Sequence, residues 1–195
     1  HQWKYQDFLK LLKNPDKKTL VFTPNPEIFV RASRDREFAD ILSKATYNVP
    51  DGNGLYVGYM MSEWTSFFHA SWRTLFHKNK VSEQYGELIK GSDLTRDILE
   101  SWKYKPQKIL IIDKKNEIPK NEFEIRKAEI QKDLKNIIET KYPGNTIFVV
   151  FAGEKNPNEI ASFIKEEGIE YVFSCIGMKS QEKLLVEIFD YLDDS

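Results

Sequence analysis

The second half of the chain alternates apolar, strand-like runs with helical patterns, and this order limits the possible folds more than any other feature. The runs are short and rich in β-branched and aromatic residues, whereas the segments after them repeat apolar residues at helical spacing. Strands in this order pair in parallel through helical crossovers, and continuously apolar strands are buried on both faces. The sequence therefore predicts an α/β fold with a Rossmann-like parallel sheet flanked by helices. The expected strands are Lys108–Ile112, Thr146–Phe151 and Glu170–Cys175, and the expected helices are Glu122–Lys141, Asn156–Glu167 and Ser180–Leu192.

The first half contains the same kinds of element in shorter form. We expect Asn25 to cap the helix that follows it, because Asn is a favoured cap and prolines suit first-turn positions. No repeat or clear linker interrupts the chain, so we expect a single domain over 1–195, with a first half at 1–104 and a second at 105–195. The expected elements are a helix at Tyr5–Leu12, a strand at Thr19–Phe22, a helix at Glu27–Ser33, a further helical stretch to Lys44 and a short segment at Tyr47–Val49.

Composition excludes several classes of protein. A chain of 195 residues, 41% of them hydrophobic, can bury a core without disulfides or metal. Lys+Arg 29 against Asp+Glu 30 leaves a formal charge of −1, so we expect no nucleic-acid partner. The single cysteine, Cys175, lies in an apolar run and is expected to be a small core residue. No apolar stretch approaches the roughly 20 residues that span a bilayer, and no export signal is present, so we expect a cytoplasmic protein. The chain has His1 in place of an initiator methionine and ends shortly after a helix. We therefore expect a piece of a longer protein, truncated at its C-terminus.

Four polar or glycine-rich clusters follow the ends of apolar runs. In open α/β sheets, ligands bind outside the carboxyl ends of the strands, so these clusters are the candidates for a binding site. Each also has a purely structural explanation as a helix cap or a tight turn. The clusters are Thr23-Pro24-Asn25-Pro26-Glu27, Asp51-Gly52-Asn53-Gly54, Gly91-Ser92-Asp93-Leu94 and Gly177-Met178-Lys179-Ser180-Gln181-Glu182.

In order, spacing and secondary-structure context, these four motifs resemble the WecG/TagA/CpsF glycosyltransferases, glycosyltransferase family 26. The family pattern has Thr-x-Asn-x-x, Asp-Gly-x-Gly, Gly-x-Asp-Leu and Gly-x-Pro-x-Gln-Glu, and the match extends from about Leu20 to Leu185. The resemblance implies inverting transfer of N-acetylmannosamine or a related sugar from a UDP-sugar donor. The implied acceptor is N-acetylglucosamine on a lipid diphosphate, in the synthesis of teichoic acid or another bacterial surface polysaccharide.

The resemblance also implies roles for individual residues. Asp51 would be the general base, beside glycines such as Gly52 that let substrate approach closely. Thr23 and Asn25 would contact the donor sugar or its phosphates, and Gln181 would bind the donor. Glu182 ranks second to Gln181, because an acidic residue in the first turn of a helix has a structural explanation. The remaining candidates for substrate binding are Gly91, Ser92 and Asp93, which suit an anion at a helix start or a plain cap, and Gly177 and Lys179.

The chain departs from the family pattern at several positions. Leu88 stands where the family usually has an arginine, Asp113-Lys114 replaces a Gly-Gly pair, and Lys179 replaces the proline of the last motif. The arginine-rich C-terminal appendage of the family is absent. These departures leave a rival interpretation open, namely a non-catalytic domain that binds a nucleotide-sugar or a protein partner. We expect no cofactor and no obligatory metal, because no convincing Asp-x-Asp pair lies near a strand end.

The segment Tyr59–Lys80 has no counterpart in the usual family pattern. On a helix it would place Trp64, Phe68 and Trp72 on one face, with basic residues nearby. Such a face suits contact with the membrane surface where a lipid-linked acceptor is met, which would make the protein peripheral on the inner face of the membrane. The alternative is an amphipathic helix packed on the core or on another subunit of a homo-oligomer.

Overall fold

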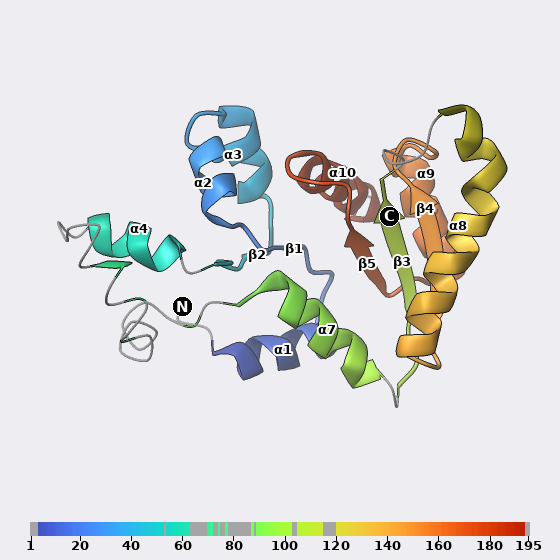
Figure 1. Ribbon diagram of the computed structural model, residues 1–195, viewed down its shortest axis with the longest axis horizontal. Helices are drawn as coiled ribbons and strands as arrows, with labels where there is room; N and C mark the ends of the chain where they lie inside the picture. The colour runs from blue at the N-terminus through green and yellow to red at the C-terminus, as the bar shows by residue number, and fades with distance from the viewer. Residues whose placement is uncertain are drawn as a thin grey trace. The chain divides into compact units, whose positions relative to one another are not determined.

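Three parallel strands form the main sheet of this protein, as a computed structural model shows (Figure 1). The order is β4-β3-β5, with β3 at Lys108–Asp113, β4 at Thr146–Phe151 and β5 at Tyr171–Ser174. Both neighbours of β3 run parallel to it. The structure describes residues 4–52, 54–62, 70–71, 74, 77, 87, 89–102, 105–114 and 120–193, without the side chains of residues 58, 59, 61, 62, 120, 121, 123–125 and 193. The expected Rossmann-like α/β fold is confirmed.

The chain divides into two compact units, His1–Ile98 and Leu99–Ser195, and each is described by itself. The boundary falls inside helix α7 (Gly91–Ser101), a few residues before the halves expected from the sequence meet. The second unit contains the three-stranded sheet with helices α8 (Lys120–Lys141), α9 (Pro157–Glu167) and α10 (Ser180–Asp193). The positions of these helices agree with the sequence prediction to within two residues at each end.

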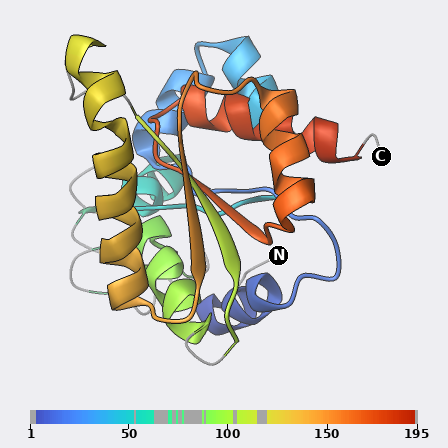
Figure 2. The same ribbon diagram turned by 90° about the vertical axis from the view of Figure 1, so that its right-hand side faces the viewer.

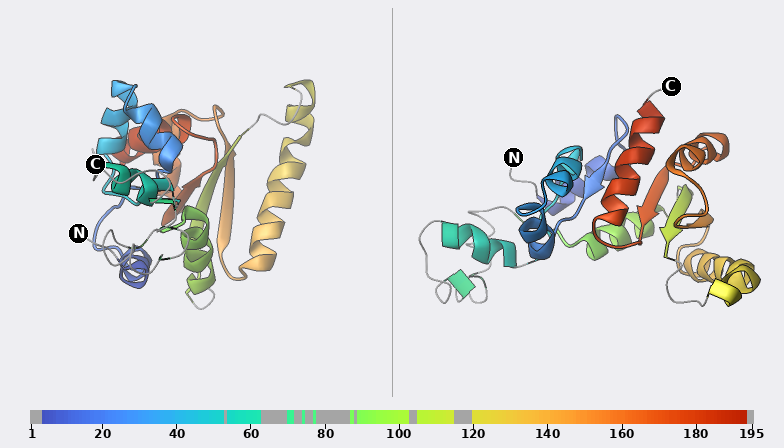
Figure 3. Two further views of the ribbon diagram at one scale, coloured as in Figure 1. Left: turned by 60° about the vertical axis from the view of Figure 1, so that its left-hand side comes forward. Right: turned by 90° about the horizontal axis from the view of Figure 1, so that it is seen from above.

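Apolar side chains from the strands and from α9 and α10 build one core in the second unit. Figure 2 and Figure 3 show α9 and α10 on one side of the strands and α8 on the other, alongside β4. Asn156 caps α9 in a reciprocal capping box with Glu159, and Gly168 ends the helix with φ +63°. The buried residues of this core are Leu110, Ile112, Val150, Ile160, Ala161, Ile164, Ile169 and Ile188.

The first unit is built on a two-stranded parallel pair, β1 (Val21–Phe22) and β2 (Tyr47–Asn48). The strands are shorter than the sequence predicted, but the parallel alignment continues past them. The N–H of Val49 donates to the carbonyl of Phe22 at 2.8 Å, and that of Asp51 donates to the carbonyl of Pro24 at 3.0 Å. The pairing therefore carries the Asp51 segment alongside the segment after β1.

Short helices surround this strand pair. Phe8 on the first helix and Phe38 on the third are completely buried, and the ring of Phe8 meets that of Tyr47 edge to face, with centroids 5.6 Å apart. These contacts fix the first helix to β2. In the part of this unit that the structure describes, the helices are α1 (Tyr5–Lys13), α2 (Pro26–Ala32), α3 (Arg36–Ser43), α4 (Gly54–Ser62) and the start of α7.

Cys175 is exposed, so its assignment to the core was wrong. The residue follows the last residue of β5, whose four side chains are all only half-buried, so the strand end has little cover. Its N–H still donates to the carbonyl of Ile112 at 2.8 Å. Desolvation by the surrounding chain and the nearby Asp113 carboxylate raise the pKa of the Cys175 thiol, so this cysteine is protonated at neutral pH.

The structure describes only part of the Tyr59–Lys80 segment. Met60 and Ala70 are fully buried in a cluster with Tyr56, and Thr74 is buried with its hydroxyl on the Ala70 carbonyl at 2.9 Å. These positions pack against the chain itself. The predicted membrane face at Trp64, Phe68 and Trp72 lies outside the described residues.

Candidate functional site

Three of the four motifs meet in the first unit. Because the N–H of Ile89 donates to the carbonyl of Pro50 at 3.3 Å, the segment before α7 runs beside the Asp51 segment, which itself runs beside Pro24. The Asp51 carboxylate then accepts the backbone N–H of Gly91 through Oδ2, at 3.2 Å. Gly91 begins α7, so one carboxylate oxygen of Asp51 satisfies a backbone donor at the helix start.

Thr23 also lies against Gly91. A Cβ atom built on Gly91 would stand 2.6 Å from the Thr23 hydroxyl oxygen and 3.1 Å from its Cβ. Only a residue without a side chain admits this approach. Thr23, Asp51 and Gly91 therefore form one contact group, which we call the Asp51 cluster.

The glycines next to Asp51 serve the packing of the chain itself. Gly52 has φ +94°, and the Cβ position of Gly54 is only 2.8 Å from Cγ of Pro26. Sequence reasoning expected these glycines to admit substrate. The ring of Pro26, the first residue of α2, lies in the space that the missing side chain of Gly54 leaves, and it is in ordinary contact with Gly52.

Asn25 is the cap of α2, as predicted. Its Oδ1 accepts the N–H of Ile28 at 3.0 Å, and its side chain is exposed. An asparagine that caps through Oδ1 can still donate through Nδ2. The capping role therefore leaves a role in binding open to Asn25.

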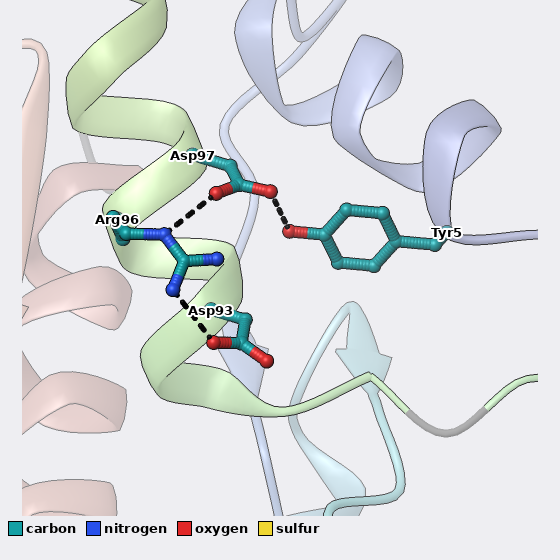
Figure 4. A network of polar contacts seen from close by, with 4 residues as sticks. All are labelled: Tyr5, Asp93, Arg96 and Asp97. Carbon is teal, nitrogen blue, oxygen red and sulfur yellow. Dashed lines mark hydrogen bonds and ion pairs between the residues drawn. The ribbon is translucent and has the colours of Figure 1, made fainter.

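Ser92 and Asp93 lie in the first turn of α7, after Gly91. Ser92 is exposed. The Asp93 carboxylate pairs with Arg96, with 3.0 Å between Oδ1 and the guanidinium. Arg96 in turn donates through Nε to Oδ1 of Asp97 at 3.0 Å (Figure 4). Asp93 therefore belongs to a network of side chains on α7, and its charge is partly balanced there.

The network reaches α1 through Tyr5. The Tyr5 hydroxyl donates to Oδ2 of Asp97 at 2.6 Å (Figure 4). The hydrogen bond from Tyr5, assisted by Arg96, lowers the pKa of the Asp97 carboxyl. Desolvation and the bond to Asp97 raise the pKa of the Tyr5 phenol. Sequence reasoning missed this network because nothing in the sequence pairs residues 5 and 97.

The fourth motif lies in the second unit, at the start of α10. The Gln181 amide is held at both ends, since Oε1 accepts the N–H of Gly177 at 3.3 Å and Nε2 donates to Oε1 of Glu182 at 2.9 Å. Glu182 is only 2% exposed, and its Oε2 has no hydrogen-bond partner among the described residues. Burying a carboxylate oxygen without a hydrogen-bond partner costs free energy. Glu182 is therefore not an ordinary solvent-exposed acidic residue in the first turn of a helix.

Two lysines mark where this loop differs from the family pattern. A Cβ atom on Gly177, which has φ +97°, would stand 3.0 Å from Nζ of Lys114, so the missing side chain admits the end of that lysine. Lys179 has φ +67°, a left-handed conformation that a proline cannot adopt. The backbone of the loop at 177–180 therefore differs from one with proline at position 179. In addition, Lys114 lies beside the last motif.

Among the residues that the structure describes, no group of three or more His, Cys, Asp or Glu side chains could hold a metal ion. No helix of the described chain is both long and apolar enough to cross a membrane.

Comparison with known proteins supports the resemblance seen in the motifs. Residues 1–66 match the glycosyl transferase WecG/TagA/CpsF family. The match covers the Thr-Pro-Asn-Pro segment and the Asp-Gly-Asn-Gly turn, and it confirms the predicted resemblance over that part of the chain. No curated protein matches the chain.

Proposed function

We propose that the chain, whose first 66 residues match a glycosyltransferase family, is an inverting glycosyltransferase that moves a sugar from a UDP-sugar to a lipid-linked acceptor. The observation that carries the proposal is the Asp51 cluster, in which Thr23, Asp51 and Gly91 come together from three separate motifs. The sugar is N-acetylmannosamine or a relative, and the acceptor is N-acetylglucosamine on a lipid diphosphate of cell-wall polysaccharide synthesis.

Asp51 is the general base in this proposal. Its Oδ2 accepts the Gly91 N–H, which orients the carboxylate. The other oxygen, Oδ1, takes the proton of the acceptor hydroxyl. As the acceptor oxygen attacks the anomeric carbon, its proton passes to Asp51. The bond from the anomeric carbon to the diphosphate oxygen breaks, and UDP leaves with the electron pair. A single displacement of this kind inverts the anomeric centre.

The residues around Asp51 have supporting roles. The Thr23 hydroxyl and the Asn25 amide nitrogen contact the donor sugar or its phosphates, and the backbone near Gly52 lies close to the reacting groups. Ser92, exposed in the first turn of α7, offers a hydroxyl beside a helix N-terminus, where anions are favoured. Asp93 holds the Arg96 side chain near the start of α7 through their ion pair.

The last motif binds the donor in the second unit. The Gln181 amide is fixed in one orientation by Gly177 and Glu182, which favours recognition of a specific pattern of donors and acceptors. The unpartnered Oε2 of Glu182 suits a ligand hydroxyl or N–H rather than a phosphate. Lys114, at Gly177, and Lys179 supply positive charge for the diphosphate in place of the arginine that Leu88 replaces.

A lipid-linked acceptor has to be met at the membrane surface. We therefore assign the protein to the cytoplasmic face of the membrane as a peripheral protein, held there through Trp64, Phe68 and Trp72.

Turnover of the donor tests the proposal. The full chain is incubated with UDP-N-acetylmannosamine and a short-chain lipid diphosphate carrying N-acetylglucosamine, and released UDP and the disaccharide product are measured. Release of both in equal amounts, dependent on the acceptor, is expected. Binding of the UDP-sugar without any product would favour the rival interpretation, a non-catalytic nucleotide-sugar-binding domain, to which Leu88 and Asp113-Lys114 point. Absence of both binding and product would favour a protein-interaction domain.

A further inference from the structure

One residue of α1 contacts the chain on both sides of Gly91. The Tyr5 backbone N–H donates to Oε2 of Glu87 at 2.6 Å, four residues before Gly91. The Tyr5 hydroxyl donates to Oδ2 of Asp97 at 2.6 Å, six residues after Gly91. The Gly91 N–H that binds Asp51 therefore lies between two points that Tyr5 holds.

We propose that Tyr5 is a positioning residue that holds Glu87 and helix α7 so that the Gly91 N–H stays on the Asp51 carboxylate. The expected effect of Tyr5 on sugar transfer rests on the proposed function. Its expected effect on the contact between Gly91 and Asp51 does not. Tyr5 belongs to none of the four motifs.

Gly91 is joined to Asp97 by helix α7 and follows the buried Ile89. Asp97 lies on α7 together with Gly91, about 9 Å along the same rigid helix at 1.5 Å per residue. On the other side, Ile89 is 1% exposed and its N–H is on the Pro50 carbonyl at 3.3 Å. A shift of α7 along its axis would move Gly91 away from Asp51 by the same amount.

Tyr5 is itself anchored. The buried side chains of Phe8, Leu9 and Leu12 fix α1 in the core of the first unit. The bond to Asp97 is short and has a charged acceptor, which is the stronger kind of hydrogen bond, and Arg96 holds the other Asp97 oxygen. The Tyr5 phenol therefore adds a polar contact between α1 and α7 to the burial of Leu94 and Ile98 on α7.

Tyr5→Phe tests the inference, because it removes the hydroxyl and keeps the backbone bond to Glu87. Tyr191→Phe is the matched control, since Tyr191 is 45% exposed on α10 in the other unit. The readouts are amide hydrogen exchange at Gly91 by NMR, and kcat and donor KM for transfer. In Tyr5→Phe, we expect exchange at Gly91 to rise and kcat to fall by about two- to tenfold, as for loss of one hydrogen bond. Donor KM and exchange at buried amides such as that of Leu110 stay unchanged, and the control matches the wild type.

The possible outcomes separate this inference from the proposed function. Unchanged exchange at Gly91 in a folded Tyr5→Phe variant overturns the inference, whatever the activity. Faster exchange at Gly91 with an unaltered transfer rate shows that Tyr5 does hold the Gly91 N–H on Asp51. It also shows that Asp51 is not the general base. If Tyr5→Phe unfolds, Asp97→Ala removes the acceptor of the Tyr5 hydroxyl from the other side of the same hydrogen bond. A local rise in Gly91 exchange in that variant supports the inference, and no local change overturns it.

Discussion

The Asp51 carboxylate accepts the backbone N–H of Gly91 at 3.2 Å across 40 residues of sequence. This contact gives a structural reason for two motifs at once. The aspartate has one oxygen fixed at a helix start, and the glycine has no side chain because Thr23 occupies that space. The same geometry that keeps the chain packed also holds a carboxylate in a constant orientation, as a general base requires.

Substitution of Gly91 tests this packing. Gly91→Ala would place a Cβ atom 2.6 Å from the Thr23 hydroxyl oxygen, so we expect a loss of about 1–3 kcal/mol in the free energy of unfolding. Without the clash, alanine in a helix would instead gain about 0.5–1 kcal/mol over glycine. Urea denaturation of Gly91→Ala, Thr23→Ala and the double variant measures the coupling. If Gly91→Ala stabilises the protein while Thr23 is unchanged, Thr23 and Gly91 do not approach each other this closely in solution.

The Tyr5–Asp97 bond gives stability a specific pH dependence. The pKa of Asp97 is lowered in the folded chain, so its contribution is present above the ordinary value of 3.8 and is lost as pH falls through the folded value. The pKa of Tyr5 is raised above 10.0, so the contribution of the phenol is complete below that pH and declines as pH rises further. Both effects are small, because these side chains are only partly buried. Urea midpoints from pH 2 to 5 should fall less steeply in Tyr5→Phe than in the wild type, and identical slopes would contradict the assignment.

Donor binding should depend on the held amide of Gln181. Calorimetry should show that UDP binding weakens by about tenfold or more in Gln181→Ala, the effect of losing one or two polar contacts. Glu182→Gln keeps a carbonyl for Nε2 of Gln181 but replaces the unpartnered oxygen by a donor, so it should also weaken binding. The control is Glu166→Gln, exposed on α9. Equal UDP affinity in all three variants would show that the last motif is not part of the donor site.

Contact with the membrane is tested at the aromatic face. Serine at Trp64, Phe68 and Trp72 together should abolish binding to anionic vesicles, because each buried aromatic side chain contributes about 1.5–3 kcal/mol. Phe29→Ser is the control, since Phe29 is 39% exposed on α2. Unfolding or dissociation of an oligomer in the triple variant would assign the face to the core or to a subunit interface. Unchanged vesicle binding would place the contact elsewhere.

Local patterns predicted most of the fold. The strands from β3 to β5 and the helices after them were predicted because apolar periodicity is a property of neighbouring residues. The cap at Asn25 was predicted for the same reason, since a cap depends on the residues that follow it. Exposure at Cys175 was not predicted, because it depends on which elements cover the end of β5.

The arrangement of the site depends on contacts between distant residues, and the sequence could not give it. The Asp-Gly turn was predicted, but the close approach of Pro26 to Gly54 was not. Glu182 ranked second to Gln181 as a binding candidate, because a first-turn acidic residue has a structural explanation, and only the three-dimensional arrangement shows that it is buried beside Gln181. The approach of Lys114 to Gly177 likewise joins residues from different strand ends.

Asp51→Asn tests the central claim most directly. The asparagine carbonyl can still accept the Gly91 N–H, so the fold and UDP binding should stay near wild type while the base is lost. The measurement is the rate of disaccharide formation from UDP-N-acetylmannosamine by folded wild type and variant, at saturating donor and with an assay sensitive to slow turnover. We predict a loss of at least about 10²-fold in kcat. A folded Asp51→Asn variant that transfers sugar at the wild-type rate would contradict the claim and leave Asp51 as the residue that closes the turn and caps α7.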